Sequence, residues 1–161
     1  MKAYHTFGPV CSPQSRILIL GSFPSVKSRE QGFYYGHPQN RFWKLIAALL
    51  GESEPHSIEE KKTLLLRRHI ALWDVIESCS IEGSSDQSIR DVVCNPLQQV
   101  TDCSQIRQVF ANGKKAFDLY EKYGKEKTGL PCQKLPSTSP ANAAYSMEKL
   151  REAWSVIVEF L

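Results

Sequence analysis

The stretch ILILGSFPS at residues 17–25 decides the fold that the sequence predicts. Its first four residues, Ile17 to Leu20, are all apolar and do not alternate with polar side chains, which is typical of a strand buried on both faces. Strands of this kind belong to parallel sheets that are covered by helices on both sides. The turn-rich GSFPS at 21–25 then ends the strand. We therefore expect a central parallel strand whose carboxyl end opens into a loop.

Three other short apolar runs predict the remaining strands of this sheet: Ile70 to Ile76, Ile106 to Ala111 and Cys132 to Leu135. Helical patterns alternate with these runs, and such alternation is typical of α/β proteins. The sequence therefore predicts the α/β class, as a three-layer α/β/α sandwich around a short four-stranded parallel sheet. Between the second and third strands, segment 78–95 is polar and turn-rich, and segment 96–105 is only weakly helical.

Capping residues mark the ends of four predicted helices. Asn and Ser side chains accept hydrogen bonds from the free N–H groups at the start of a helix, and a Ser followed three residues later by Glu forms a capping box. Gly favours the left-handed conformation that ends one. The first helix is expected to start after Asn40 and to end before Gly51, and the second to start after Ser57 and to end near His69. The third is expected to start at Lys114 and to stop at Gly124, and the fourth to start after Ser146 and to end at Leu161.

The composition is that of one ordinary globular domain. The chain has 161 residues, of which 42% are hydrophobic and 23% charged. A chain of this length can bury roughly 70% of the surface that it exposes when unfolded, so a single core suffices to stabilise it. No internal repeat or linker divides the sequence. We therefore expect residues 1–161 to form a single domain and the protein to be a monomer.

The sequence carries no sign of a membrane or secretory segment. No apolar run approaches the roughly 18 residues that suggest a membrane span. The N-terminus, MKAYHTFGPV, lacks the continuous apolar segment of a secretory signal. We therefore expect a cytoplasmic protein with no membrane partner.

The five cysteines show neither a CxxC motif nor a Cys/His ladder, which favours reduced thiols over disulfides or a metal centre. The sequence predicts no metal and no cofactor.

The formal charge of +3 is too small to establish a polyanionic partner. One stretch is more basic: residues 106–134 carry seven Lys and Arg against three Asp and Glu. Such a stretch can face phosphates, although a run of charge is more often a solvated face.

Three distinctive segments follow predicted strands. They are GSFPS at 21–25, NGKK at 112–115 and PSTSPAN at 136–142. In open parallel sheets, ligands bind at the carboxyl ends of the strands, where such loops converge. The sequence therefore predicts a site built by these three loops. The connection GFYYGHPQNRFW at 32–43 brings aromatic side chains, a histidine and an amide, which would suit one wall of a pocket.

These segments resemble the uracil-DNA glycosylase superfamily. The resemblance rests on GSFPS, GFYYGHPQNRFWKLI and LPSTSPANA in that order, it spans most of the chain, and HPxNRFWK is its most specific part. The branches it approaches are the mismatch-specific uracil and thymine glycosylases and, more closely, the hypoxanthine (deoxyinosine) DNA glycosylases. It implies a monofunctional glycosylase of base-excision repair that hydrolyses the N-glycosidic bond of deaminated bases, above all hypoxanthine, in single- or double-stranded DNA.

One departure from the superfamily distinguishes the branch. Uracil-cleaving relatives usually carry Asn or Asp where this chain has Ser22, and serine cannot act as a carboxylate base. The resemblance to the deoxyinosine branch implies that Asn40 takes on a catalytic role beside Ser22. It also implies that Tyr35 stacks on the flipped base.

The remaining residues receive roles from the chemistry. A flipped base needs aromatic faces and polar groups along its edge, and here we expect Phe23, Tyr35, His37 and Asn112. Backbone N–H groups of Ser22 and Phe23 can donate to the carbonyl of hypoxanthine. The stiff PSTSPAN segment would enter the duplex as a wedge. Phosphates would bind to Ser137, Ser139, Lys114 at a helix N-terminus and, more weakly, Ser25.

Each assignment has a structural alternative. Asn40 could be a helix cap, Ser22 and Ser25 turn residues, and Tyr35 and His37 buried packing. Two carboxylates, Asp74 and Asp86, are expected to be solvated or to cap helices, because neither has a partner at a spacing suited to acid–base chemistry.

Other functions also stay open at this stage. The chain could be a uracil or mismatch glycosylase, or a DNA-binding module of the same fold that lost catalysis with Ser22. A serine hydrolase is a third alternative, but GSFPS lacks the GxSxG motif of such enzymes.

Overall fold

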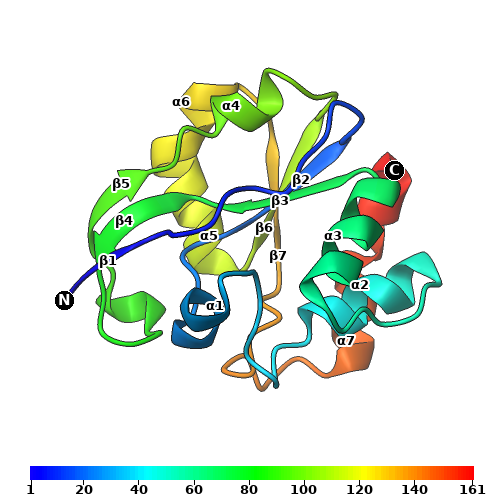
Figure 1. Ribbon diagram of the computed structural model, residues 1–161, viewed down its shortest axis with the longest axis horizontal. Coiled ribbons are helices and arrows are strands. Elements are labelled where there is room, and N and C mark those ends of the chain that lie inside the picture. The colour runs from blue at the N-terminus through cyan, green and yellow to red at the C-terminus, as the bar shows by residue number, and fades with distance from the viewer.

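The computed structural model describes residues 1–161 and contains the expected parallel sheet (Figure 1). Its four strands lie side by side in the order β3-β2-β6-β7, all parallel. The central strand β2 is buried along its whole length, as its unbroken apolar run predicts. The strands are β2 (Ile17–Gly21), β3 (Ile70–Asp74), β6 (Gln108–Asn112) and β7 (Cys132–Leu135).

Helices cover both faces of this sheet, which confirms the three-layer α/β/α sandwich (Figure 1). One layer consists of α2 (Phe42–Leu50), α3 (Ile58–Arg67) and α7 (Met147–Trp154). The opposite layer consists of α4 (Gln98–Thr101), α5 (Lys114–Leu119) and α6 (Lys125–Thr128). A single cluster of buried apolar side chains runs through the layers. None of the helices combines the length and the hydrophobicity that a membrane-spanning helix needs.

Three of the predicted caps form where the sequence indicates. Ser57 and Glu60 make both hydrogen bonds of the capping box at the start of α3, and Ser146 accepts from the N–H of Lys149 at the start of α7. Gly51 ends α2 in the left-handed conformation with φ of 68°. The final helix is shorter than expected, because α7 ends at Trp154 and a 3-10 helix, Ser155–Phe160, replaces its last turns.

A second sheet was not predicted. The expected strand Ile70 to Ile76 is divided at Val75, and its second part begins an antiparallel sheet of order β1-β4-β5. Segment 78–95, expected to be polar and turn-rich, supplies most of two of these strands and a short 3-10 helix, Asp86–Ser88. The sequence pattern does not indicate these strands, because they are partly exposed and their pairing is interrupted by register shifts. The strands are β1 (Lys2–Tyr4), β4 (Ile76–Ser80) and β5 (Arg90–Cys94).

The helix after β6 does not stop at Gly124, so that prediction is wrong. The chain continues through a π-helical turn, Tyr120–Gly124, into α6 and ends at Gly129 with φ of 69°. Gly124 has ordinary helical φ and ψ angles of −98° and −33°. A Cβ on Gly124 would lie 2.7 Å from the Tyr120 ring and 2.9 Å from Leu97 Cδ1. The absence of a side chain at Gly124 therefore allows close packing against Tyr120 and Leu97 and does not mark the end of a helix.

A further short helix, α1 (Val26–Gln31), follows the GSFPS loop directly. Its N-cap is Ser25, whose Oγ accepts a hydrogen bond from the N–H of Ser28 at 3.2 Å. The loops after β2, β6 and β7 and the 32–41 connection gather with α1 at the carboxyl edge of the parallel sheet (Figure 1). The fold therefore brings the predicted loops together.

Candidate active site

A cavity of about 300 Å³ lies at this edge of the parallel sheet. Its lining contains nine of the ten residues that the sequence predicts for a site, and Lys114 is the exception. The structure therefore brings together segments that are more than a hundred residues apart in the chain. The nine residues are Ser22, Phe23, Ser25, Tyr35, His37, Asn40, Asn112, Ser137 and Ser139.

Asn40 uses the two atoms of its amide differently. Its Oδ1 accepts hydrogen bonds from the N–H of Phe42 at 3.0 Å and from Oγ1 of Thr138 at 2.8 Å. The first contact resembles a helix cap, although Arg41 occupies the cap position of α2. No group of the chain accepts a hydrogen bond from Nδ2 of Asn40, and the half-buried side chain lines the cavity. Asn40 thus supports α2 and still offers the cavity an N–H donor.

Thr138, which the sequence analysis missed, joins Asn40 to Asn112. Its Oγ1 accepts from Nδ2 of Asn112 at 3.0 Å, and its backbone N–H donates to Oδ1 of Asn112 at 3.0 Å. Thr138 is fully buried, so its hydroxyl has no alternative in solvent. Asn112 is therefore largely committed to Thr138, and only one of its N–H bonds is left for a base edge. The signal was the position of Thr138 between two serines already under consideration.

Tyr35 forms an aromatic wall of the cavity. Its ring stacks on Phe42 with centroids 4.2 Å apart and an interplanar angle of 24°. The residue has φ of 52°, an uncommon conformation for a non-glycine residue. The hydroxyl of Tyr35 is buried without a hydrogen-bond partner. Burial, and then the charge of Asp74, raise the pKa of this hydroxyl above its ordinary value against the smaller, opposite effect of the nearby Asn112 side chain, so Tyr35 presents a neutral phenol to the cavity.

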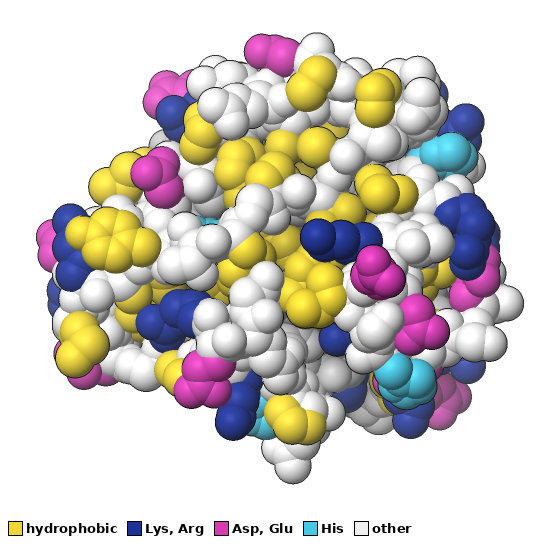
Figure 2. All heavy atoms as spheres, viewed as in Figure 1, with side chains coloured by type: hydrophobic (Ala, Val, Ile, Leu, Met, Phe, Trp, Pro, Cys, Tyr) yellow, Lys and Arg dark blue, Asp and Glu magenta, His cyan; other side chains and the backbone are white.

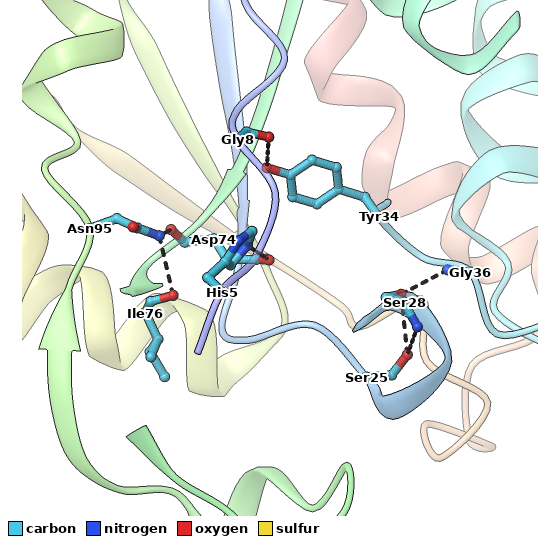
Figure 3. A network of polar contacts seen from close by, with 9 residues as sticks. All are labelled: His5, Gly8, Ser25, Ser28, Tyr34, Gly36, Asp74, Ile76 and Asn95. Atoms are coloured by element: carbon cyan, nitrogen blue, oxygen red, sulfur yellow. Dashed lines mark hydrogen bonds and ion pairs between the residues drawn. The ribbon is translucent and has the colours of Figure 1, made fainter. Parts of the chain in front are cut away.

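The expectation that Asp74 is solvated is wrong. Asp74 is only 3% exposed and lines the cavity from the end of β3. Its Oδ2 lies 2.7 Å from Nε2 of His5, as Figure 3 shows. His5 follows the first strand of the second sheet, and its sequence position gave no signal of this contact. A buried carboxylate therefore faces the region where a ligand would lie.

Asp86 is the second carboxylate of the cavity. Oγ of Ser22 donates to Oδ1 of Asp86 at 3.1 Å. Although Asp86 as a residue is exposed, desolvation of its carboxyl group raises the pKa, and the hydrogen bond from Ser22 and the charge of Lys115 oppose this effect. Asp86 also lines a neighbouring groove, so it lies at the rim of the cavity rather than at its floor.

Arg41 fixes the loop that follows β7. Its guanidinium donates to the carbonyl oxygens of Ser139 at 2.9 Å, Asn142 at 3.0 Å and Thr138 at 3.4 Å, and also to that of Tyr145. One side chain beside Asn40 thus holds most of the PSTSPAN segment. Arg41 belongs to the HPxNRFWK motif, but its residue type and position in the sequence do not indicate these contacts.

A serine network holds the opposite side of the cavity. Oγ of Ser25 donates to Oγ of Ser28, which in turn accepts from the N–H of Gly36 at 2.9 Å (Figure 3). This network ties α1 to the connection that carries Tyr35. His37 also belongs to this connection, and its Nδ1 accepts from the N–H of Gln39 at 3.1 Å. Tyr35 is therefore held from two sides, by Phe42 and by the serine network.

Lys114 lies outside the cavity, at the start of α5. It forms an ion pair of 2.6 Å with Asp118. Together with Lys134 it lines a neighbouring groove of about 560 Å³, which shares Ser137 and Ser139 with the cavity. The face shown in Figure 2 mixes Lys and Arg with Asp and Glu rather than forming one basic stripe.

Comparisons with known proteins give the family and the fold of the chain. Residues 9–158 match the family described as the uracil DNA glycosylase superfamily. A hypoxanthine DNA glycosylase of Methanosarcina acetivorans is 36% identical over 153 residues, which are 94% of this chain and 95% of that protein. A hypoxanthine DNA glycosylase of Methanosarcina barkeri is 34% identical over 92% of this chain and 94% of its own. The solution NMR structure of a proposed uracil DNA glycosylase from M. acetivorans superposes with a TM-score of 0.81, at 35% identity and 94% coverage of both chains.

Proposed function

Because the chain belongs to the uracil DNA glycosylase superfamily, we propose that it is a monofunctional DNA glycosylase that hydrolyses the N-glycosidic bond of deoxyinosine. The enzyme releases free hypoxanthine and leaves an abasic site for base-excision repair. The relatives named hypoxanthine DNA glycosylase cover nearly the whole chain, which supports this substrate. The protein acts on DNA as a monomer.

The amide of Asn40 carries the proposal. Its oxygen is bound by Phe42 and Thr138, so the side chain is fixed with its N–H bonds free on the cavity side. A donor of this kind cannot take a proton from water. It can hydrogen-bond the departing base or orient the attacking water, and both stabilise the transition state.

The reaction starts with the base leaving the stack, at a cost of a few kcal/mol that is smaller for a poorly paired base. The ring of Tyr35, supported by Phe42, stacks on the flipped base. The backbone N–H groups of Ser22 and Phe23 make no hydrogen bond within the chain. They therefore donate to the carbonyl oxygen of hypoxanthine, where negative charge develops as the base departs.

Water completes the hydrolysis. The C1′–N9 bond breaks, its electron pair leaves with the base, and the oxygen of water bonds to the cationic C1′. The proton that water releases needs an acceptor, and the carboxylate of Asp86 at the cavity rim fits this need. Ser22, which donates to Asp86, orients that carboxylate. The departing base finally takes up one proton, so atoms and charges balance.

The surroundings of the cavity suit a DNA backbone. Ser137 and Ser139 lie between the cavity and the groove that Lys114 lines. Hydroxyl and ammonium groups in these positions bind phosphates and set the position of the duplex. The loop held by Arg41 serves as the wedge beside the flipped nucleotide.

The substitution Asn40→Asp tests the role of Asn40. An aspartate keeps an oxygen for Phe42 and Thr138 but removes both N–H donors, so stability is largely retained while single-turnover release of hypoxanthine falls at least about 100-fold. Gln39→Ala, at the exposed neighbouring position, is the matched control and keeps the wild-type rate. Wild-type rates in Asn40→Asp would remove Asn40 from the mechanism. No release of hypoxanthine by the wild-type protein would refute the function itself.

Parallel assays separate the alternatives. Faster release of uracil than of hypoxanthine would identify a uracil or mismatch glycosylase, and salt-dependent DNA binding without any base release would identify an inactive module. A serine hydrolase is not supported, because the hydroxyl of Ser22 donates to Asp86 and no histidine contacts it.

A further inference from the structure

The floor of the cavity contains a carboxylate that the reaction above does not use. Asp74 ends β3 directly beside Gly21, the last residue of β2, with which it pairs across the sheet. Asp74 is only 3% exposed, and it lines the cavity. A buried carboxylate is costly unless hydrogen bonds satisfy it. The partners of its two oxygens therefore indicate what the site is built to bind.

One oxygen is satisfied by His5. The side chains of His5 and Asp74 are 2% and 5% exposed, and Nε2 of His5 lies 2.7 Å from Oδ2 of Asp74. Nδ1 of His5 is buried with no partner. Because a carboxylate oxygen can only accept, the contact is a hydrogen bond that Nε2 of His5 donates to Asp74. No Lys or Arg forms an ion pair with Asp74.

The other oxygen, Oδ1, accepts no hydrogen bond from the chain. It lies above the backbone of Gly21, together with the buried and unpartnered hydroxyl of Tyr35. A Cβ on Gly21 would collide with Oδ1 of Asp74 and would lie 3.1 Å from Oη of Tyr35. Gly21 thus leaves room for a carboxylate oxygen beside the base-stacking residue. An N–H of a bound ligand would give this oxygen its missing donor.

Hydrogen-bond donors lie next to this acceptor. Ser22 and Phe23 continue the chain from Gly21, and their backbone N–H groups are free. Residues that line the cavity therefore carry unpartnered backbone donors, at Ser22 and Phe23, and an unpartnered acceptor, at Asp74. The complementary ligand edge is a carbonyl beside a protonated ring nitrogen, which is the lactam edge O6 and N1–H of hypoxanthine. Adenine presents the reverse order, an amino donor beside the unprotonated N1.

We propose that Asp74, oriented by His5, determines specificity by accepting the N1–H of the flipped base, so that the site selects the lactam that deamination creates. This inference rests on the proposed function and adds the chemical class of base. The same edge occurs in xanthine and uracil, which the site therefore accepts in hydrogen-bonding terms. Guanine also carries it, so exclusion of guanine depends on its 2-amino group and not on Asp74.

Two deoxyoligonucleotide duplexes test the inference, one with deoxyinosine and one with 2′-deoxynebularine, a purine with hydrogen at C6 and a lone pair on N1. Single-turnover base release is measured for wild type, Asp74→Asn and the control Asp102→Asn, which changes an exposed aspartate. An asparagine can rotate its amide to donate to N1 of nebularine, whereas aspartate cannot. The inosine-to-nebularine rate ratio falls at least about tenfold in Asp74→Asn and is unchanged in Asp102→Asn.

A merely structural Asp74 would slow both substrates equally, and an unchanged ratio would therefore overturn the inference. If Asp74→Asn does not fold, the wild-type protein gives the answer with 1-methyl-2′-deoxyinosine, in which a methyl group replaces the N1 proton. Cleavage of that substrate is at least about 100-fold slower than that of deoxyinosine. Equal rates would overturn the inference while leaving the proposed function intact. Failure of the wild-type protein to release hypoxanthine would refute both.

Discussion

At the scale of single residues, the hydroxyl of Thr138 connects two amides that lie on different elements. Asn40 stands just before α2 and Asn112 at the end of β6, and both bond the side chain of Thr138. Because Thr138 binds the oxygen of the Asn40 amide, the N–H donor of that amide is already in place before the substrate binds. The entropic cost of reaching the transition state is therefore lower. The position of Asn40 therefore depends on a residue that does not itself need to touch the substrate.

Replacing Thr138 with valine tests this dependence. The change keeps the shape of the buried side chain but leaves Oδ1 of Asn40 and Nδ2 of Asn112 each without one partner. We expect the free energy of unfolding to fall by about 1–3 kcal/mol, and the rate of hypoxanthine release to fall while substrate binding is largely kept. Urea denaturation and single-turnover kinetics measure the two effects. The exposed Thr63→Val is the control, and equal kinetics in both variants would show that Asn40 keeps its position unaided.

The raised pKa of the Asp86 carboxyl group predicts that the rate of cleavage depends on pH. Desolvation raises the pKa of this carboxyl group, and the ionised form is the one that accepts the proton of water. Cleavage therefore declines as the pH falls through an apparent pKa above the ordinary value for aspartate. Asp86→Asn removes this acidic limb and slows cleavage about 100-fold or more, the usual contribution of a general base. Single-turnover rates between pH 4 and 8 check this, and an unchanged limb in Asp86→Asn would assign it to another group.

At the scale of secondary structure, local patterns predicted well where a strand is continuously buried or where residues close in sequence form a cap. The apolar run of β2, the capping box before α3 and the left-handed Gly51 each announce an element through neighbouring residues. The second sheet lacks such signals, because β1 and β5 are exposed or half-buried, the pairing of β4 with β5 is interrupted by register shifts, and the other partner of β4 lies far away at the N-terminus. The pairing of His5 with Asp74, 69 positions apart, depends on that sheet and was equally invisible.

The candidate site shows the same division. Six of the nine predicted residues that line the cavity stand at or just after the ends of strands, and parallel topology brings those segments together. The other three, Tyr35, His37 and Asn40, stand in the 32–43 connection, and the family resemblance indicated Tyr35 and Asn40. The contributions of Thr138, Arg41 and His5 could not be predicted, because each depends on a contact between distant segments. The residue types indicated which functional groups the site contains. They did not indicate which oxygen and nitrogen atoms have no hydrogen-bond partner within the chain and can therefore bind a ligand.

Gly124 gives a prediction at this scale. A Cβ at this position would enter the ring of Tyr120 and the side chain of Leu97, whereas Gly129 has open space but a left-handed backbone. We expect Gly124→Ala to lower the free energy of unfolding by about 1–3 kcal/mol through overpacking, and Gly129→Ala by about 1 kcal/mol through backbone strain. Urea denaturation measures both. A smaller cost at Gly124 than at Gly129 would show that the π-helical turn relaxes around the added methyl group.

At the scale of the whole molecule, the small net charge constrains how DNA is bound. The formal charge is +3, and two lysines of the basic stretch, Lys114 and Lys125, already form ion pairs with acidic neighbours. Acidic and basic side chains also alternate on the face in Figure 2. Long-range attraction is therefore weak, and affinity depends on a few phosphate contacts near the cavity together with the flipped base.

The dependence of binding on salt follows from this picture. Each phosphate contact contributes about one unit to the slope of log K against log salt concentration. We expect Lys114→Gln and Lys134→Gln, at the groove beside the cavity, each to reduce the slope for an abasic-site duplex by up to about one unit. Arg107 lies just before β6, at the opposite edge of the sheet. We expect Arg107→Gln to leave the slope unchanged. Fluorescence anisotropy at several salt concentrations measures the slopes. A larger change for Arg107→Gln than for the two lysines would move the path of the DNA to the amino edge of the sheet, where the cavity could not receive a base.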